Sequence, residues 1–357
     1  MDFDFADVLI EVMERNASDL HLTAGSPPMV RQRGQLSALD YPELDATTVR
    51  EVVYSILTND QRQKLETDWQ IDLAYSIPGR ARFRVNAYFQ RASLGAALRL
   101  IPQEMPRLDD LGLPNTLRDF IKKPRGFVLV TGPTGSGKST TLASMLDLIN
   151  EERDEHIMTI EDPIEFLHRH KRCIVNQREI GADAQTFSLA LKAALRQDPD
   201  VILVGEMRDL DTISTALTAA ETGHLVFATL HTQDTAQTID RIVDVFPPAQ
   251  QHQVRMQLSV ALQGIVTQQL LPTADGLGRA VAAEVLVPTN AVRNLIREGK
   301  THQIHSALQT GASHGMQTMD ASLVDLVRKG KITRELAESR SSSPEELRRL
   351  MGTVQAA

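Results

Sequence analysis

Hydrophobic and polar positions show two different periodicities along this chain. Near the N-terminus, residues 5–14 place apolar side chains at the three-and-four spacing of an amphipathic helix. Residues 81–89 alternate strictly, which predicts a strand with one buried face and a second face that carries Arg82, Arg84 and Asn86. The pattern is typical of a small α/β unit.

Shorter signals complete this N-terminal unit. Residues 19–22 and 29–31 predict two short strands, separated by turn-forming residues at 25–28. Thr47 is expected to cap a helix that runs through Leu57.

The pattern changes after residues 103–116, a proline-containing stretch that we assign as a linker between an N-terminal domain, residues 1–102, and a second domain, residues 117–357. In the second domain, short continuous apolar runs alternate with helical segments, which favours a parallel sheet covered on both faces. The chain is expected to be helical from about residue 289. The predicted strands span 127–131, 157–160, 201–204, 225–229 and 280–287.

Composition narrows the class of protein. The chain has 357 residues, of which 42% are hydrophobic and 24% charged, a composition typical of soluble globular domains. The formal net charge is −8 and the pI is about 5.7, so no long basic track for nucleic acid is expected. The one cysteine, Cys173, excludes a disulfide within the chain and a four-cysteine zinc site.

Neither a targeting segment nor a membrane span is predicted. The first residues mix acids with apolar side chains and lack the basic start of a secretory signal. No apolar stretch approaches the roughly 18 residues that a membrane helix needs. We therefore expect a cytoplasmic protein that contacts a membrane only through partners.

The strongest chemical signal is a glycine-rich loop directly after the strand predicted at 127–131. A glycine, four further residues and Gly137-Lys138-Ser139 match the P-loop pattern in full, and a helix is predicted to follow. Glycines let successive backbone N–H groups point at phosphate oxygens, Lys138 can reach the β- and γ-phosphates, and Ser139 can ligate Mg²⁺. The candidate phosphate-binding residues are Gly132, Pro133, Thr134, Gly135, Ser136, Gly137, Lys138, Ser139 and Thr140.

Acidic residues follow two other predicted strands. One strand leads into Glu206, which is placed to bind Mg²⁺ directly or through water. A second leads into Glu161, Asp162 and Glu165, and one of these carboxylates could orient an attacking water. The residues alone do not choose among the three.

Two histidines bracket the strand predicted at 225–229. His224 and His231 lie seven residues apart in an extended segment, so they cannot both bind one metal from a single helical face. His231 follows the C-terminal end of the strand, and it is the better placed of the two to sense a γ-phosphate.

Taken together, in their order along the chain, these motifs resemble those of the ATPases of type II and type IV secretion systems. Within that family they resemble most those of the pilus retraction ATPases. The resemblance covers nearly the whole chain. A signature of retraction ATPases, Ala-Ile-Arg-Asn-Leu-Ile-Arg-Glu, matches residues 291–298 in seven of eight positions, with Val292 as the difference. The other matching stretches are 17–22, the P-loop at 132–139, an aspartate box at 159–165, a Walker B element at 202–209 and a histidine box at 222–224 and 230–232.

The resemblance implies a fold and a function. The implied fold is a small N-terminal α/β domain of the PAS-like type, followed by a RecA-like P-loop ATPase domain with a helical C-terminal part. The implied function is that of a homohexameric motor that hydrolyses ATP with Mg²⁺ to retract a type IV pilus. Its implied partners are an inner-membrane platform protein and other motor ATPases of the pilus, at the inner face of the cytoplasmic membrane.

The resemblance also implies roles for individual residues beyond Lys138 and Ser139. Glu165 is similar to the base that polarises water, Glu206 to the Walker B acid that supports the metal, and His231 to the histidine near the γ-phosphate. Arg82 and Arg84 on the basic strand, and Arg99 after it, are similar to arginines that reach the nucleotide of the same or a neighbouring subunit. The resemblance does not single out one of the three.

Three other interpretations stay open at this stage. The first is an extension or type II secretion ATPase with a reduced N-terminus, or an accessory paralogue of the retraction ATPases. The second is a RecA-like nucleic-acid translocase, which needs a basic track that a pI of about 5.7 does not favour. The third is a scaffold that binds ATP without cycling, which would not need Lys138, Glu165 and Glu206 together.

Overall fold

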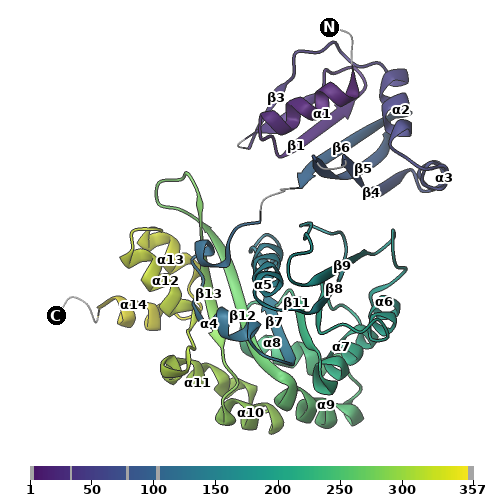
Figure 1. The fold of residues 1–357 in the computed structure, drawn as a ribbon. Helices are drawn as coiled ribbons and strands as arrows, with labels where there is room; N and C mark the ends of the chain where they lie inside the picture. Colours follow the sequence, from purple (N-terminus) through teal and green to yellow (C-terminus); the bar gives the residue numbers. More distant parts are fainter. Residues whose placement is uncertain (1–3, 33, 78–79, 102–104, 353–357) are drawn as a thin grey trace. The chain divides into compact units, whose positions relative to one another are not determined.

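The chain divides into two compact units (Figure 1). The first unit holds the elements from α1 to β6 and also includes residues 165–167, and the second holds the elements from η1 onward. The predicted linker begins with residues 103 and 104, which lie outside the described residues. This computed structural model describes residues 4–32, 34–77, 80–101 and 105–352.

The first unit is an antiparallel sheet with helices packed on it. Its strands lie in the order β3-β2-β1-β6-β5-β4, and every neighbouring pair is antiparallel. Apolar side chains from the helices and from alternate strand positions form one hydrophobic core. The elements are α1 (Phe5–Glu14), β1 (Asp19–Thr23), β2 (Met29–Gln32), β3 (Gln35–Ala38), α2 (Ala46–Ser55), α3 (Asn59–Asp68), β4 (Gln70–Ile77), β5 (Ala81–Gln90) and β6 (Ser93–Ile101).

The strand β5 confirms the alternation predicted for residues 81–89. Phe83 and Val85 are completely buried in the core, whereas Arg82 and Arg84 lie on the opposite face of the sheet. The polar face of the strand is therefore separated from the core by the pleat of the sheet itself.

The predicted cap of α2, Thr47, is wrong. Asp45 caps this helix, because its carboxylate accepts a hydrogen bond from the N–H of Thr48 at 2.7 Å. Aspartate and threonine are both good capping residues, but the aspartate also brings a negative charge to the positive end of the helix dipole.

The second unit is a larger sheet followed by a group of helices. Its strands are β7 (Gly126–Thr131), β8 (His156–Glu161), β9 (Ile174–Glu179), β10 (Val201–Val204), β11 (Leu225–Leu230), β12 (Leu262–Pro272) and β13 (Arg279–Leu286). Its helices are η1 (Leu108–Leu111), α4 (Thr116–Ile121), α5 (Lys138–Glu152), α6 (Phe187–Ala194), α7 (Leu210–Thr222), α8 (Thr235–Asp244), α9 (Pro248–Ala261), α10 (Asn290–Arg297), η2 (Thr301–Gln303), α11 (Ile304–Thr310), η3 (Ala312–His314), α12 (Met319–Arg328), α13 (Arg334–Arg340) and α14 (Pro344–Gly352).

The strands of this sheet lie in the order β13-β12-β7-β11-β10-β8-β9, and all neighbours are parallel except β12 and β13. Alternate residues of β7 enter different clusters: Phe127 packs in one that includes α6, α7 and α9, and Val128 in one that includes α4 and α5. The sheet is therefore covered on both faces, as the continuous apolar runs predict.

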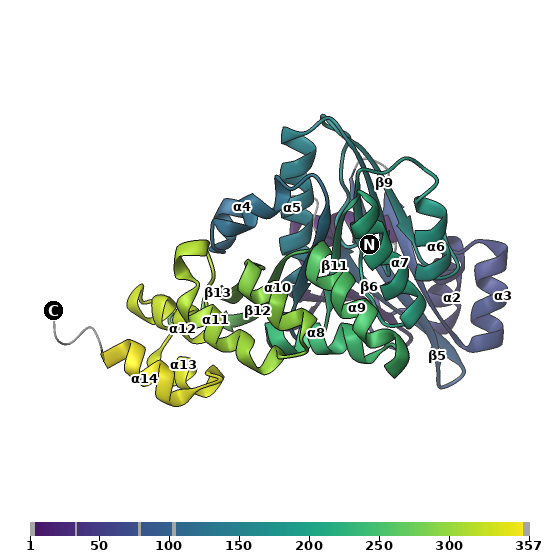
Figure 2. The same ribbon diagram turned by 90° about the horizontal axis from the view of Figure 1, so that it is seen from below.

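The C-terminal helices α12, α13 and α14 lie beside β13, at the opposite end of the sheet from β9 (Figures 1 and 2). They have a small hydrophobic cluster of their own, which includes Leu323 of α12, Ala337 of α13 and Leu347 of α14. None of the described helices is long and apolar enough to cross a membrane.

The segment before α4 packs on the second unit. Leu108 of η1 is buried in the cluster that includes α5, and the hydroxyl of Ser144 on α5 donates to the carbonyl of Pro106 at 2.6 Å. Asp109 of η1 accepts a hydrogen bond from Arg118 of α4 at 2.9 Å. These contacts place η1 close to the first turns of α5.

Candidate nucleotide site

The carboxyl ends of four neighbouring parallel strands form one edge of the second sheet. Thr131 at the end of β7 pairs with Leu230 of β11, and Val204 at the end of β10 pairs with Ile160 of β8. The residues that follow these strands therefore gather along one edge, where open α/β sheets bind their ligands. They include the glycine-rich loop, His231, Glu206 and the segment from Glu161 onward.

The glycine-rich loop has the backbone of a phosphate cradle. Gly132 has φ of 138°, and a side chain there would bring its Cβ to 2.3 Å from the carbonyl oxygen of Gln268. Gly137 has φ of 91° and directly precedes α5, whose N-terminus supplies free N–H groups and positive potential. The loop can therefore close around an anion only with glycine at these positions.

The predicted phosphate-binding side chains line this loop. Lys138 donates to the carbonyls of Gly132 and Pro133 at 2.9 and 3.0 Å, so its ammonium group lies across the loop. Ser139 and Thr140 are half-buried in the first turn of α5, and Ser136 is buried. Pro133, Thr134 and Gly135 form the exposed rim.

Glu206 is held by two neighbours just beyond β10. Its carboxylate lies 2.6 Å from the guanidinium of Arg208 and 3.1 Å from Nε2 of His231. Burial raises the pKa of Glu206, but the hydrogen bond and charge of Arg208, together with His231, outweigh burial, so the pKa lies below its usual range. The group is thus kept as a carboxylate, the form that a cation needs.

The three acids after β8 have different surroundings. Glu161 accepts hydrogen bonds from the Thr159 hydroxyl at 2.6 Å and from the Gln177 amide at 3.2 Å. Asp162 is exposed, and its charge acts on Arg208. Glu165 is exposed and makes no hydrogen bond or ion pair with any residue that the structure describes.

The two histidines of the histidine box lie at opposite ends of β11. The ring nitrogen Nδ1 of His224 lies 3.0 Å from the carbonyl oxygen of Ala219, at the end of α7. His231 follows the carboxyl end of β11 and contacts Glu206, as described above. The structure thus gives His224 a local contact with a helix end and brings His231 to the candidate site.

The arginines predicted to reach the nucleotide lie together on the polar face of the first unit. Arg84 of β5 pairs directly with Arg99 of β6. Arg99 forms an ion pair with Asp19 at 2.9 Å, whereas Arg84 is exposed and has no hydrogen bond or ion pair within the described part of the chain. Two like charges placed opposite each other on a sheet repel, so this pair favours an additional anion.

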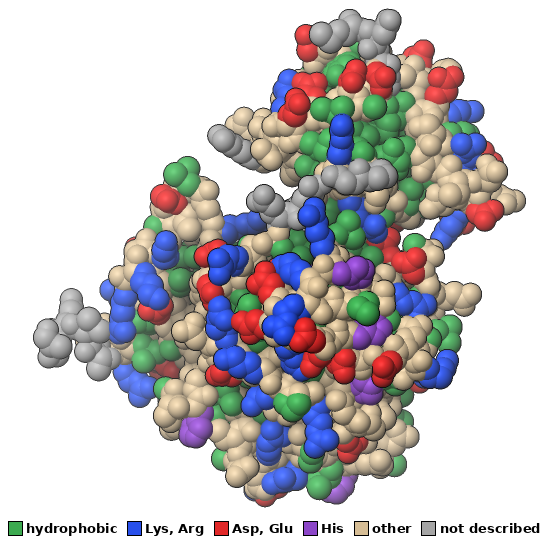
Figure 3. All heavy atoms as spheres, in the orientation of Figure 1, with side chains coloured by type: hydrophobic (Ala, Val, Ile, Leu, Met, Phe, Trp, Pro, Cys, Tyr) green, Lys and Arg blue, Asp and Glu red, His purple; other side chains and the backbone are tan. Residues whose placement is uncertain are grey.

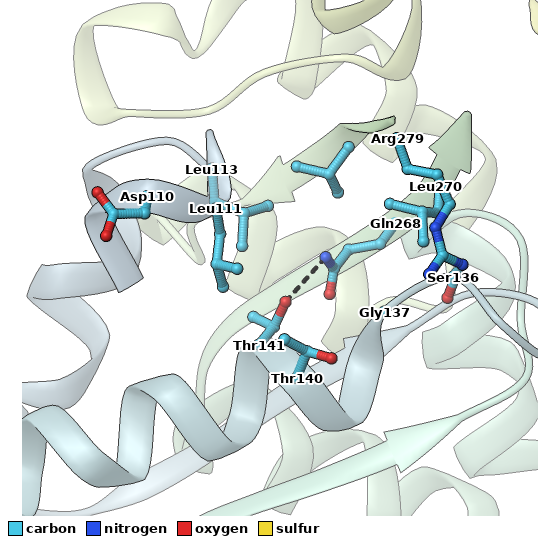
Figure 4. A pocket seen from close by; sticks show the side chains of 11 residues that line it. Asp110, Leu111, Leu113, Ser136, Gly137, Thr140, Thr141, Gln268, Leu270 and Arg279 are labelled. Atoms are coloured by element: carbon cyan, nitrogen blue, oxygen red, sulfur yellow. Dashed lines mark hydrogen bonds between the residues drawn. The ribbon is translucent and has the colours of Figure 1, made fainter. Parts of the chain in front are cut away.

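A pocket of about 260 Å³ adjoins the glycine-rich loop on the second unit (Figure 4). One end is formed by Gly137 and Thr140 at the start of α5, and Figure 4 also shows the Gln268 amide donating to the Thr141 hydroxyl, at 3.0 Å. The remaining walls, which sequence reasoning missed, come from η1 and the turn after it, from β12 and from β13: Asp110, Leu111, Leu113, Leu270, Arg279 and Val281. The leucines and the valine among them are recognisably apolar in the sequence, but no motif connects these distant segments.

The parallel sheet and the glycine loop before α5 define a P-loop nucleotide-binding protein with a RecA-like core. The model of the Type II/IV secretion system protein family matches residues 4–349, and the chain therefore belongs to this family of ATPases. This confirms the family and the two-part α/β fold that the motifs predict.

Comparisons with individual proteins agree. The chain is 51% identical over 342 residues to the type IV pilus retraction ATPase PilT of Pseudomonas aeruginosa, covering 96% of this chain and 99% of that one. It is 50% identical over 320 residues to a twitching motility protein of Neisseria gonorrhoeae, covering 90% and 86% of the two chains. The crystal structure of the pilus retraction motor PilT with bound ADP matches with a TM-score of 0.92 at 51% identity, covering 98% of this chain and 100% of that one.

Proposed function

We propose that this protein is a motor that hydrolyses ATP to drive retraction of a type IV pilus. One observation carries the proposal: the glycine-rich loop, Glu206 and His231 lie along one sheet edge, in a chain about half identical to a pilus retraction ATPase. The retraction signature at residues 291–298, most of which forms α10, adds support.

In this proposal the glycine-rich loop binds the phosphates. Its N–H groups and the N-terminus of α5 cradle the β-phosphate, and Lys138 moves from the loop carbonyls to the β- and γ-phosphate oxygens. Ser139 and Glu206 hold Mg²⁺. Among the described residues no three His, Cys, Asp or Glu side chains gather into a metal cluster, and a hydroxyl with a carboxylate suits Mg²⁺, which takes its other ligands from phosphates and water.

Glu165 orients the attacking water. The support is comparative: Glu161 is already engaged by Thr159 and Gln177, whereas Glu165 has free carboxylate oxygens. His231 lies beside Glu206 and contacts the γ-phosphate region. A positioned general base contributes about 10²–10⁴-fold in rate.

The pocket beside the loop receives the base of the nucleotide. Its leucine and valine side chains offer apolar surface to a planar ring, and Arg279 and the buried Gln268 offer polar atoms. Thr140 and Gly137 belong both to this pocket and to the phosphate loop, so one nucleotide can occupy the two sites together.

The first unit supplies positive charge to a nucleotide. Arg84 and Arg99 stabilise the charge that develops on the transferred phosphoryl group, in the same subunit or in its neighbour. Six copies form a ring, in which nucleotide binding favours closed interfaces by its differential affinity and hydrolysis with product release opens them.

In the cell, this ring works at the inner face of the cytoplasmic membrane. It moves an inner-membrane platform protein and acts beside other motor ATPases of the pilus, so membrane contact is indirect. Pilin subunits are thereby withdrawn from the fibre. The relative from Neisseria gonorrhoeae named a twitching motility protein supports this role.

A nucleic-acid translocase fits less well. On the face of the second unit shown in Figure 3, lysines and arginines are interspersed with acids and form no continuous basic track. The net charge of −8 points the same way. Stimulation of ATP hydrolysis by single-stranded DNA would favour the translocase instead.

A deletion strain tests the proposed function. Loss of a retraction motor should leave excess surface pili and abolish twitching, and a wild-type copy should restore movement while a Lys138→Ala copy should not. Loss of surface pili would instead identify an extension ATPase. Normal twitching with normal pilus number would identify an accessory paralogue or remove the protein from pilus function.

A further inference from the structure

Two hydrogen bonds fix the loop after β8 at both of its ends. The N–H of Ile164 donates to Oε2 of Glu179 at 3.0 Å, and the N–H of His168 donates to Oε1 of Gln177 at 2.8 Å. Residues 165–167, which begin with Glu165, lie between these two anchors.

Both anchoring side chains come from one face of one strand. Gln177 and Glu179 are two residues apart on β9, so they project to the same side. β9 pairs in parallel with β8, and this register sets Glu179 opposite Glu161. The anchors therefore stand directly beside the strand end from which the loop departs.

These contacts are built into the interior of the second unit. Glu179 and Ile164 are each only 5% exposed, so the acceptor and the N–H that it receives are shielded from water. An unsatisfied N–H at such a place costs about 1–3 kcal/mol. Gln177 has a second contact, because its amide donates to Glu161, and it thus connects the strand end with the far end of the loop.

We propose that Gln177 and Glu179 are positioning residues for ATP hydrolysis, which hold the loop so that Glu165 meets the attacking water in a fixed geometry. This inference rests on the proposed function, in which Glu165 is the base. Neither anchoring side chain needs to touch the nucleotide. Their effect is transmitted through two backbone N–H groups, and a displacement of about 1 Å at a catalytic group can cost about 100-fold in rate.

Steady-state hydrolysis of Mg²⁺-ATP by the full-length protein tests the inference. Gln177→Ala and Glu179→Ala should each lower kcat by about 10- to 100-fold, while KM stays within about 3-fold, because the phosphate loop is untouched. Glu179→Gln keeps an oxygen that accepts from Ile164 and should retain kcat within about 3-fold. The matched control is Asn176→Ala, on the other face of β9, which contacts His156 and should leave kcat unchanged.

A second arm separates positioning from a general loss of structure. In a Glu165→Gln background, adding Gln177→Ala or Glu179→Ala should lower kcat by no more than about 3-fold, because the group that they position is already gone. If the loss of kcat in the double variant equals the product of the losses in the two single variants, the inference is wrong. If Glu179→Ala does not fold, Gln177→Ala and Glu179→Gln carry the same test, and a wild-type kcat for Gln177→Ala would contradict it.

The failure of the inference differs from the failure of the proposed function. If Glu165→Gln is slow while the anchor variants keep the wild-type kcat, the inference is wrong and the proposed function stands. If the wild-type protein does not hydrolyse ATP, or Glu165→Gln hydrolyses it at the wild-type rate, the proposed role of Glu165 is wrong.

Discussion

The two sheets of this protein place their polar side chains in opposite ways. In the second unit, the strands β7, β10 and β11 are buried along their whole length, and the charged groups of the candidate site follow their carboxyl ends. In the first unit, arginines lie along one face of the sheet, opposite the core. A buried parallel sheet thus gathers its functional groups at an edge, whereas a half-covered antiparallel sheet can present a charged surface.

The two regions also differ in how their charges are satisfied. Glu206 at the edge has Arg208 and His231 as partners within the second unit. On the sheet face, one carboxylate, Asp19, serves the facing pair Arg84 and Arg99. Burial raises the pKa of Asp19, but hydrogen bonds from Ser18 and Arg99 outweigh burial and hold it below its usual value. Glu206 at the edge thus has its partners within its own unit, while the facing arginines have fewer acidic partners than positive charges.

The largest expected effect comes from removing this excess positive charge. The double variant Arg84→Ala/Arg99→Ala should lower kcat by about 10³-fold, because arginines that stabilise a transferring phosphoryl group contribute at least that much. Of the single variants, Arg84→Ala should cost more, since Arg99 is already paired with Asp19. Rates are measured with saturating Mg²⁺-ATP on the assembled protein. Unchanged turnover in the double variant would confine the chemistry to the second unit.

The next effect lies within the aspartate box. Glu165→Gln should lower kcat by about 100-fold or more and leave ATP binding intact, because the change removes the base and not a phosphate contact. Glu161→Gln should be milder, at about 10-fold, because Glu161 is held by Thr159 and Gln177. Nucleotide titrations with ADP provide the binding control. The reverse order of severity would move the role of base to Glu161.

The stability of the second unit should decrease at acidic pH. Burial lowers the pKa of His168 to about 4; the smaller effect of Asp147 raises this pKa, and that of Lys171 lowers it further. The folded state therefore binds this proton less readily than the unfolded chain, whose histidine titrates near 6.5, and stability falls as pH drops from about 6.5 to about 4. Between pH 7 and pH 5 the loss from this group is about 2 kcal/mol.

Urea denaturation at both pH values measures this contribution. His168→Asn should lose about 2 kcal/mol less than the wild type over the interval, because its side chain does not titrate. The exposed His252 of α9 offers a matched control, and His252→Asn should follow the wild type. Identical pH dependence in the wild type and His168→Asn would show that His168 is protonated at no cost in the folded protein.

The smallest effect concerns two arginines of the retraction signature in α10. Arg293 donates to the carbonyls of Ser259 and Val260, the latter at 2.9 Å, and so caps the end of α9. Among the described residues, Arg297 donates only to Asn294 of its own helix, at 3.2 Å. Arg293→Ala should lower the free energy of unfolding by about 1–2 kcal/mol, and Arg297→Ala by less than about 0.5 kcal/mol.

Motility assays complete that last comparison. Both variants are expected to reduce twitching, but only Arg293→Ala should do so through a weakened fold. If Arg297→Ala proves the less stable protein, the division between a structural and a surface arginine in this signature is wrong.

Local sequence patterns predict many helices and strands of this fold, because the formation of each element depends largely on residues close together in the sequence. The alternation at 81–89 and the apolar runs that became β7, β10 and β11 follow directly from burial on one face or two. The helix cap illustrates the limit: Asp45 and Thr47 both have the right chemistry, and geometry decides between them.

The candidate site also contains residues that the sequence predicts and residues that it does not. The glycine loop, Glu206 and His231 carry their own local signals, because each follows a recognisable strand. The anchors Gln177 and Glu179 carry none, since an amide and a carboxylate on an edge strand are ordinary until a loop folds back onto them. The pocket walls from β12 and β13 are hidden for the same reason, because their partners lie far away in sequence.

Hydrolysis of ATP by the purified full-length protein tests the central claim most directly, with and without Mg²⁺ and beside Lys138→Ala and the exposed control Lys122→Ala. We expect Mg²⁺-dependent release of phosphate from the wild type and Lys122→Ala, and a loss of roughly 10³-fold or more in Lys138→Ala, which keeps its fold. A wild-type protein that neither binds nor cleaves ATP when assembled, or a Lys138→Ala protein with normal turnover, would contradict the assignment of this sheet edge as the catalytic centre.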